Sequence, residues 1–247
     1  MNHDSKLKFD GFEWLKKRNL YISEWKRKME LMEEKVRDKV VLDAGCGTGY
    51  ETHYLSNFAK EIHGLDINGK NIEEAKRKYS ADNLFFHTGN VESMPFKDST
   101  FDVIISCFVI EHLNDPEKFI DEAYRVIKPQ GNLIIWVPNV KNMMGIFAKI
   151  IPLNFENKIK SILYKMKKEE VIQYECFYKG NSVRKLDKLS KINFKRTYLE
   201  RFDTPVYFRY SRILFYLWYL RHKLSNNKFL NWLFLNFYVE WVSLKED

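Results

Sequence analysis

The stretch Val40-Val41-Leu42-Asp43-Ala44-Gly45-Cys46-Gly47-Thr48-Gly49-Tyr50-Glu51-Thr52 decides the fold of this chain. Its apolar, β-branched start predicts a buried strand, its alternating glycines predict a tight turn, and the residues that follow predict a helix. Glycine lets the backbone approach a ligand where a Cβ would collide, and a helix start offers free N–H groups with a partial positive charge. The stretch therefore predicts a site for a ligand that carries a carboxylate or a phosphate.

The spacing of the glycines narrows the class of ligand. A dinucleotide fingerprint needs a third glycine where Tyr50 stands, and a P-loop needs a Gly-Lys-Ser/Thr ending that is absent. The pattern Gly45-x-Gly47-x-Gly49 instead resembles motif I of class I S-adenosylmethionine-dependent methyltransferases, in the type 11 branch with the ubiquinone- and menaquinone-biosynthesis enzymes. On this stretch alone, a purely structural turn remains an alternative.

Composition indicates a globular chain of 247 residues, with 45% hydrophobic, 30% charged and 16% aromatic residues. No apolar run reaches the roughly 18–20 residues that span a bilayer, and the start lacks the apolar core of a signal peptide. The three cysteines, Cys46, Cys107 and Cys176, form no Cys-x-x-Cys pair. We therefore expect reduced thiols, a cytoplasmic protein and no metal centre.

The net charge of +8 is unevenly distributed. Residues 141–228 hold 20 lysine and arginine residues against 7 aspartate and glutamate, a surplus of 13 that leaves the rest of the chain at −5. Such a block is either a solvated surface or a region that meets an acidic partner. Partners of that kind are a phosphorylated or uronic substrate, an anionic membrane surface or nucleic acid.

Two segments after the glycine turn extend the resemblance. Residues 61–66 predict a short strand that ends on Asp66, where a carboxylate can accept hydrogen bonds from both hydroxyls of a ribose; Ile67 lies beside it. Residues 89–96 are similar to the family segment Gly-Asp-Ala-Glu followed by Leu-Pro-Phe, with Asn90 in place of the acid. The resemblance implies that the Asn90 carbonyl accepts a bond from the adenine amino group and that Val91 lies against the ring.

The fourth predicted strand, residues 101–106, leads into Cys107 and Phe108, which we expect near the sulfonium and the methyl group. Glu111-His112-Leu113 is similar to the family's Glu-His-Leu signature. His112 is the candidate catalytic residue, either as a general base or as a group that orients its loop through hydrogen bonds.

The resemblance gives the remaining residues of the first turn roles toward S-adenosylmethionine. Gly45, Cys46, Gly47 and Gly49 would receive the methionine end. Asp43 would hold the glycine loop in place or meet the ligand's amine through water. Methyl transfer is an in-line displacement, so these roles require no metal and no covalent intermediate on the enzyme.

Alternating strands and helices predict an α/β fold, a Rossmann-like doubly wound sheet that is mostly parallel. The resemblance implies the strand order 3-2-1-4-5 with a late antiparallel strand, and residues 192–198 and 237–242 look like the closing strands. We expect one methyltransferase domain over 1–247: N-terminal helices over 1–37, a cofactor-binding core over 38–139, and a basic, aromatic region over 140–247 that includes a helical insertion before the last strands. The helices over 9–36 either pack on the domain or form a lid.

The function that the sequence predicts is methyl transfer from S-adenosylmethionine, with O-methylation of an anionic small-molecule, glycan or lipid-linked acceptor. The aromatic run over 213–235 has two interpretations, contact with an anionic membrane surface or burial against the sheet or a dimer partner; the oligomeric state is open. A non-catalytic S-adenosylmethionine-binding module is one alternative function. An RNA methyltransferase is another, disfavoured because Ser106-Cys107-Phe108-Val109 replaces the Asn/Asp-Pro-Pro-Tyr/Phe tetrapeptide.

Overall fold

The computed structural model describes residues 20–139, 176–202 and 236–246, together with residues 216, 219–220 and 224; side chains are described from residue 26 onward. The chain divides into two compact units. One comprises Met1–Lys28, Lys141–Gln173 and Phe202–Leu235 and lies largely outside the described residues. The other comprises Met29–Val140, Tyr174–Arg201 and Asn236–Asp247 and holds the predicted core. The single domain over 1–247 stays a prediction.

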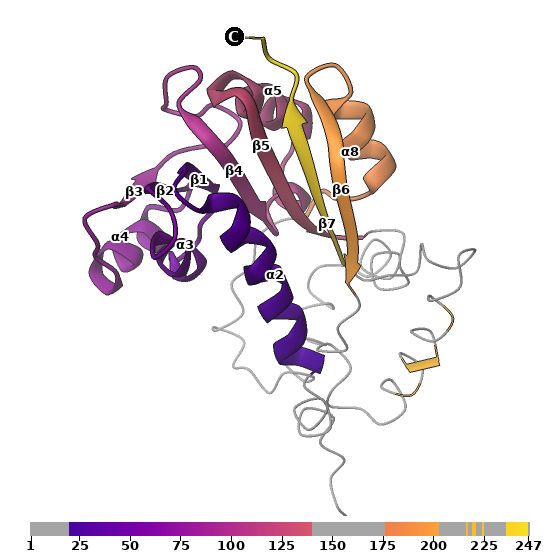
Figure 1. Ribbon diagram of the computed structural model, residues 1–247, viewed down its shortest axis with the longest axis horizontal. Coiled ribbons are helices and arrows are strands. Elements are labelled where there is room, and N and C mark those ends of the chain that lie inside the picture. The colour runs from indigo at the N-terminus through magenta and orange to yellow at the C-terminus, as the bar shows by residue number, and fades with distance from the viewer. Residues whose placement is uncertain are drawn as a thin grey trace, which may run out of the picture. The chain divides into compact units, whose positions relative to one another are not determined.

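The second unit is built on a seven-stranded sheet with the order β3-β2-β1-β4-β5-β7-β6 (Figure 1). Strands β1 to β5 pair in parallel, and β7 pairs antiparallel with β5. The predicted order 3-2-1-4-5 and the late antiparallel strand are therefore confirmed. The strands are β1 (Val40–Ala44), β2 (Glu61–Asp66), β3 (Leu84–Thr88), β4 (Phe101–Cys107), β5 (Ile127–Pro138), β6 (Phe194–Phe202) and β7 (Asn236–Ser243).

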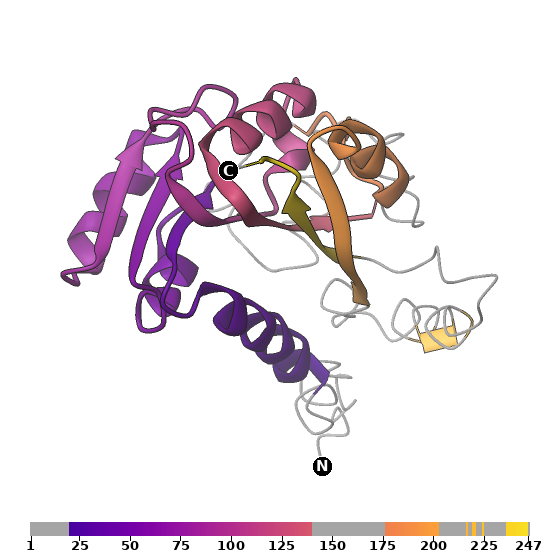
Figure 2. The same cartoon turned by 45° about the horizontal axis from the view of Figure 1, so that its top comes forward.

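Helices cover both faces of this sheet, as a doubly wound fold requires. Figure 2 shows α5 and α8 on one side of the sheet and α3 on the other. The helices of the described chain are α2 (Leu20–Val36), α3 (Tyr50–Ser56), α4 (Gly69–Lys78), the short 3-10 helix η1 (Ile110–His112), α5 (Pro116–Val126) and α8 (Val183–Ser190).

Local sequence signals explain where two of these helices start. The Asn68 side chain accepts a hydrogen bond from Lys70 N at 3.1 Å and caps α4. Asp115 caps α5 ahead of Pro116, whose fixed φ suits the first turn of a helix. Glu74 and Lys78 form an ion pair one turn apart on α4.

The core lies between the parallel strands and the helices because parallel strands are buried on both faces. Residues such as Leu42, Ile104 and Ile135 are fully buried in one cluster with the inner face of α5. That face comprises Phe119, Ile120, Ala123 and Val126. The β-branched runs in the sequence therefore become the centre of the sheet.

One element boundary differs from the sequence prediction. The pattern Lys-Pro-Gln-Gly over residues 128–131 predicts the end of a helix there, but α5 already ends at Val126 and β5 begins at Ile127. Pairing with β4 steps from Phe101–Ile127 to Val103–Asn132, so extra residues of β5 are accommodated in an irregularity. Gln130 adopts a left-handed φ of 57° within this irregularity. The pattern Lys-Pro-Gln-Gly is compatible both with the end of a helix and with such an irregular strand, so the sequence does not distinguish them.

The second half of α2 packs on the sheet unit. Met29, Met32 and Val36 are buried, and Lys35 Nζ lies 2.9 Å from Glu240 Oε2 of β7. The packing interpretation of the N-terminal helices is confirmed for this half. The lid interpretation concerns the helices predicted over 9–36, of which residues 9–19 lie outside the described chain. Most of the helical insertion predicted before the last strands and most of the aromatic run over 213–235 also lie outside it. No helix in the described ranges is long and apolar enough to cross a membrane.

Candidate cofactor and active site

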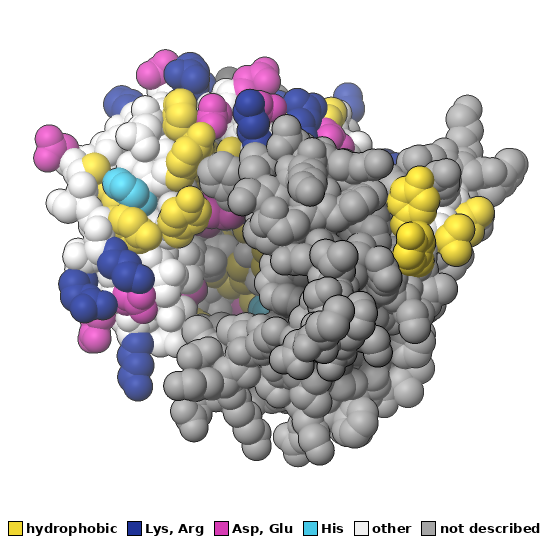
Figure 3. Space-filling model, turned by 90° about the horizontal axis from the view of Figure 1, so that it is seen from below, with side chains coloured by type: hydrophobic (Ala, Val, Ile, Leu, Met, Phe, Trp, Pro, Cys, Tyr) yellow, Lys and Arg dark blue, Asp and Glu magenta, His cyan; other side chains and the backbone are white. Residues whose placement is uncertain are grey.

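The predicted cofactor residues meet at one edge of the sheet. Asp43 lies near the end of β1, Asp66 is the last residue of β2, and Asn90 follows β3 by two residues. These three strands are parallel neighbours, so their carboxyl ends share one edge. Ile67, after β2, and Phe108, after the neighbouring parallel strand β4, are exposed at the same edge. Figure 3, viewed from below, shows hydrophobic side chains gathered on the described part of that side.

The glycine turn is fastened to β2. Gly45 N and Cys46 N both donate to Leu65 O, at 2.7 and 3.0 Å, and Gly47 N donates to Asp66 Oδ2 at 2.9 Å. Asp66, which the sequence analysis expects to bind the ribose, therefore also holds the glycine turn. A single carboxylate joins the two parts of the predicted cofactor site.

The three glycines have different surroundings, although all three have positive φ angles. A Cβ on Gly45 would lie 2.2 Å from Val109 Cγ2, and one on Gly49 would lie 2.6 Å from Phe86 Cζ. A Cβ on Gly47 would meet no atom within 4 Å. Gly45 and Gly49 therefore allow close packing, and Gly47 faces open space where a ligand can approach the backbone.

We predict that Gly49→Ala destabilises the protein more than Gly47→Ala. Both variants force alanine into the left-handed region, at a cost of about 1 kcal/mol, but only Gly49→Ala also clashes with Phe86. Urea unfolding should show a total loss of about 2–4 kcal/mol for Gly49→Ala. Equal losses in the two variants would contradict the different roles of these glycines.

Asp66 is held in place by hydrogen bonds on both carboxylate oxygens. Besides Gly47 N at Oδ2, Oδ1 accepts from Asn68 N at 2.9 Å and from Asn71 Nδ2 at 3.3 Å. A carboxylate accepts about four hydrogen bonds, so one position remains for a ribose hydroxyl and a second opens if Asn71 moves away. The predicted ribose role is compatible with this geometry.

We predict that Asp66→Ala weakens binding of S-adenosylmethionine by about 2–3 kcal/mol, or roughly 30- to 150-fold in Kd. The variant loses a charge-assisted bond to the ribose and the acceptor that holds Gly47. Isothermal titration calorimetry measures the change. Asp82→Ala is the matched control, because Asp82 is exposed and lies outside the site; equal affinities of the two variants would remove Asp66 from the site.

Asp43, in β1, and Cys46, in the glycine turn, are two ionisable residues at the start of the predicted cofactor site. Asp43 is buried, and its Oδ2 accepts a hydrogen bond from Thr52 Oγ1 at 2.6 Å, which ties β1 to α3. Burial raises the pKa of the Cys46 thiol, and the nearby charges of Asp43 and Asp66 raise it further. Cys46 therefore stays a neutral thiol. The predicted role of Asp43 in holding the glycine loop or meeting the ligand's amine stays a prediction.

The segment that would meet the adenine is held by its own turn. Asn90 Oδ1 accepts a hydrogen bond from Glu92 N at 2.8 Å, so one of the two acceptor positions of this carbonyl is used. Val91 is buried in the core cluster. The predicted bond from the adenine amino group would use the second acceptor position of Asn90.

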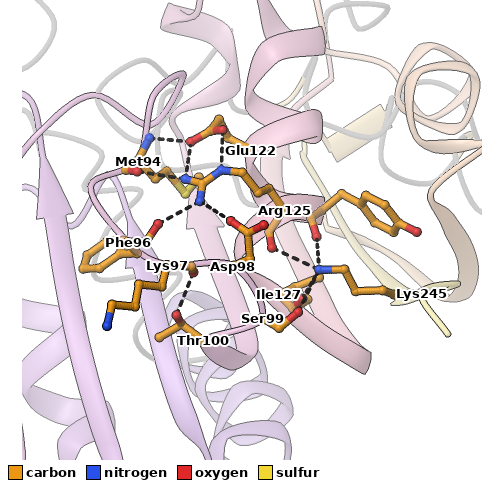
Figure 4. Close-up of polar contacts among 11 residues, drawn as sticks. Met94, Phe96, Lys97, Asp98, Ser99, Thr100, Glu122, Arg125, Ile127 and Lys245 are labelled. Atoms are coloured by element: carbon orange, nitrogen blue, oxygen red, sulfur yellow. Dashed lines mark hydrogen bonds and ion pairs between the residues drawn. The ribbon is translucent and has the colours of Figure 1, made fainter. Parts of the chain in front are cut away.

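Helix α5 fixes the rest of this segment (Figure 4). Arg125 donates to Phe96 O at 2.8 Å and to Met94 O at 2.9 Å, and Glu122 Oε2 accepts from Met94 N at 2.6 Å. Arg125 also pairs with Asp98 at 2.8 Å. The loop after Asn90 is thus positioned by side chains from a different element.

The carboxyl end of β4 carries a strained residue. Phe108 has a φ of 56°, which a bulky side chain rarely adopts, and its N–H donates to Trp136 O at 2.8 Å. Backbone strain of this kind concentrates at ligand sites and costs on the order of 1–3 kcal/mol. The exposed Phe108 ring supports the prediction that this strand end borders the reacting group.

Helix η1, which follows Phe108, is fixed by the segment over 176–181. Glu111 O accepts from Phe177 N at 2.7 Å and from Tyr178 N at 3.1 Å. Cys176 Sγ lies 3.4 Å from Nδ1 of His112. His112 is therefore half-buried in a fixed position, which suits both of its predicted roles, and its role as a base stays a prediction.

Glu111 is the most unusual ionisable group of this region. Its side chain is 5% exposed, and its Oε2 has no hydrogen-bond partner in the described part of the chain. Burial raises the pKa of the Glu111 carboxyl to about 7, while the neighbouring His112 and Asn181 lower it. The carboxyl can therefore gain or lose a proton near neutral pH.

We predict that Glu111→Gln changes how stability depends on pH. Because folding raises the pKa of this acid, the folded state binds a proton more tightly, so stability is full below about pH 4.5 and falls as the pH rises to about 7. The Gln variant should lose this fall and be more stable than the wild type at pH 8, by up to about 3 kcal/mol. Urea unfolding at pH 5 and pH 8 measures it. If the free energy of unfolding changed with pH in the same way in both proteins, Glu111 would not be an acid whose pKa is raised by burial.

Sequence reasoning did not assign roles to Thr52, Arg125, Glu111 and Asn181. The spacing of Glu122 and Arg125 indicates an ion pair on a helix, but not that both reach the loop over 94–98. Asn181 comes from a segment 70 residues beyond Glu111, and no local pattern joins them. Contacts of this kind depend on the tertiary fold.

The fold is Rossmann-like, and the hydrogen bond between the glycine turn and Asp66 lies at the edge of the sheet where open α/β sheets bind ligands. Residues 42–135 match the family described as the methyltransferase domain. This part of the chain belongs to the class I S-adenosylmethionine-dependent methyltransferases, whose cofactor is S-adenosyl-L-methionine.

Individual relatives agree with this family. A probable S-adenosylmethionine-dependent methyltransferase of Mycolicibacterium smegmatis is 30% identical over 119 residues, 47% of this chain and 46% of that protein. The demethylmenaquinone methyltransferase of Lactiplantibacillus plantarum is 33% identical over 46% of this chain and 54% of its own length. The chain thus spans about half the length of these curated relatives.

A crystal structure of a methyltransferase from Listeria monocytogenes has the same fold. It superposes with a TM-score of 0.58 at 14% identity, over 89% of this chain and 97% of that one. At this identity the likeness concerns the fold alone.

Proposed function

We propose that this protein transfers the methyl group of S-adenosylmethionine to an acceptor. The observation that carries the proposal is the hydrogen bond from Gly47 N to Asp66 Oδ2, with open space beside Gly47. It places a ligand-accessible backbone next to a carboxylate at the strand end where a nucleoside would lie. Both features fall within the residues that match the methyltransferase domain.

S-adenosylmethionine supplies, when bound, a methyl group activated on a sulfonium. The chain's own residues hold and orient it: Gly47 would admit the methionine end, Asp66 the ribose, and Asn90 with Val91 the adenine. Phe108 would border the reacting methyl at the end of β4 and help to exclude water. A displacement of this kind needs the nucleophile in line with the transferred group, so positioning supplies much of the rate.

We further propose O-methylation of an anionic acceptor, either a small molecule, a glycan or a lipid-linked compound. The surplus of 13 positive charges over residues 141–228 supports this class of acceptor, since a basic region raises the local concentration of anions. The same charge would support contact of the protein with an anionic membrane surface, which a lipid-linked acceptor would require.

Isotope transfer tests the proposal directly. Extracts of cells should be incubated with the protein and with S-adenosylmethionine labelled on its methyl carbon, and analysed by mass spectrometry for labelled products. Gly47→Val is the control: it fills the open space beside the turn, so it should bind little cofactor and transfer no label. We expect labelled anionic products with the wild type only.

Two other outcomes would contradict the proposal. Cofactor binding without labelled products, in extracts treated with and without nuclease, would indicate a non-catalytic binding module. Label that appears only in RNA would indicate an RNA methyltransferase, which should also bind RNA with a marked dependence on salt.

A further inference from the structure

The two edge strands of the described sheet differ in charge. Strand β3 lies at one end of the sheet (Figure 2), and its sequence Leu84-Phe85-Phe86-His87-Thr88 contains no acidic residue, lysine, arginine or proline. Strand β6 lies at the other end and carries four charged residues, Lys195, Arg196, Glu200 and Arg201. Charges and proline on an edge strand discourage pairing with another chain, so β6 is protected in this way and β3 is not.

Two hydrogen bonds show which main-chain groups of β3 face its neighbour β2. Ile62 N donates to Asn83 O at 2.8 Å, and Gly89 N donates to Asp66 O at 3.0 Å. Along a strand, every second residue directs its N–H and C=O groups to the same side. The odd-numbered residues from 83 to 89 therefore face β2, and the even-numbered residues of β3 direct their main-chain groups to the outer edge.

Phe85 gives this edge an exposed aromatic ring that is held in position. Its side chain is 41% exposed, and its ring stacks on that of His63 with centroids 5.1 Å apart. The ring of Phe96 meets both His63 and His87 edge-on, at 5.9 and 5.2 Å. An aromatic side chain that its neighbours already order loses little entropy when a partner covers it, which suits it to an interface.

The histidines beside Phe85 leave the edge uncharged at neutral pH. His63 Nδ1 lies 2.9 Å from His87 Nε2, and His63 Nε2 lies 2.6 Å from Glu61 Oε1. Burial lowers the pKa of His87, and the positive charges of His63 and Lys76 lower it further. His87 is therefore neutral at pH 7, and β3 does not repel a second strand of the same sequence.

We propose that β3 pairs antiparallel with β3 of a second copy of this chain, about a two-fold axis at Phe86. In this register each Phe86 N–H donates to the carbonyl of the partner's Phe86, and each Thr88 N–H donates to the carbonyl of the partner's Leu84. Phe85 lies opposite the partner's His87 on the same face, as a closely spaced aromatic pair that extends the ring stack. The result is one continuous sheet through both copies.

The direction of the main-chain groups selects this register. The residue on the two-fold axis must direct its N–H and C=O groups outward, which excludes Phe85 and His87 because their groups face β2. Among the even-numbered residues, Phe86 is at the centre of β3, so an axis there pairs the whole strand. A second copy is thus a partner whose length, charge and hydrogen-bonding groups match those of this edge.

Sedimentation equilibrium of the full chain tests the pairing. The average mass should rise from one chain toward two between about 1 and 100 μM, since a short strand pair is a small interface. We expect Phe85→Lys to raise the Kd of the dimer at least about tenfold, because it places a charge on the edge. Ile192→Lys is the matched control: Ile192 is 87% exposed near β6, so this change should leave the Kd unaltered.

Cross-linking tests the register and does not depend on the lysine variant. In the double variant Phe85→Cys, His87→Cys, each new thiol faces one on the partner across about 4.5 Å between Cα atoms, within the range of a disulfide. Oxidation should give a covalent dimer on a non-reducing gel. Each single variant is a control that should cross-link no more than the wild type, because neither position lies opposite its own copy.

Three results would overturn the proposal. A wild type that stays a single chain over this concentration range would show that β3 is covered otherwise or has another partner. A dimer whose Kd is the same in Phe85→Lys and in Ile192→Lys would place the interface elsewhere. Single cysteine variants that cross-link as well as the double variant would contradict the axis at Phe86. If Phe85→Lys fails to fold, as judged by circular dichroism, the cross-linking result decides.

Discussion

The Gly47–Asp66 hydrogen bond is the contact on which the whole site depends. It joins the turn after β1 to the end of β2, and it fixes a carboxylate that also accepts from Asn68 at the start of α4. A glycine turn alone could be a structural feature, and an acid at a strand end could be a surface charge. Their direct bond joins them, because the carboxylate that we propose for the ribose also accepts a hydrogen bond from the glycine loop.

Much of this could be predicted from the sequence because the signals are local. The β-branched run over 40–44, the alternating glycines and the acid at 66 each reflect backbone geometry within a few residues. The strand order, by contrast, came from the resemblance, since periodicity cannot show which strands pair. The start of β5 at Ile127 was missed because Lys-Pro-Gln-Gly fits both a helix stop and an irregular strand.

The roles of individual side chains were harder to predict. The sequence treats the three glycines as equivalent, but Gly45 and Gly49 are required by the neighbouring side chains of Val109 and Phe86, which are distant in the chain. Likewise, the hydrogen bond that occupies part of the Asn90 carbonyl and the unsatisfied oxygens of Glu111 and Asn181 depend on tertiary packing. Sequence patterns therefore predict which strand ends carry the candidate cofactor residues, but they do not predict contacts between residues that are distant in the chain.

The central claim is that S-adenosylmethionine lies across the carboxyl ends of β1, β2 and β3, with its sugar on Asp66. A crystal structure of the protein soaked or grown with S-adenosylmethionine tests this most directly. The account predicts electron density with a ribose hydroxyl within hydrogen-bond distance of Asp66 and the methionine end beside Gly47. Density for the cofactor elsewhere, or a side chain filling the space at Gly47 in the complex, would contradict it.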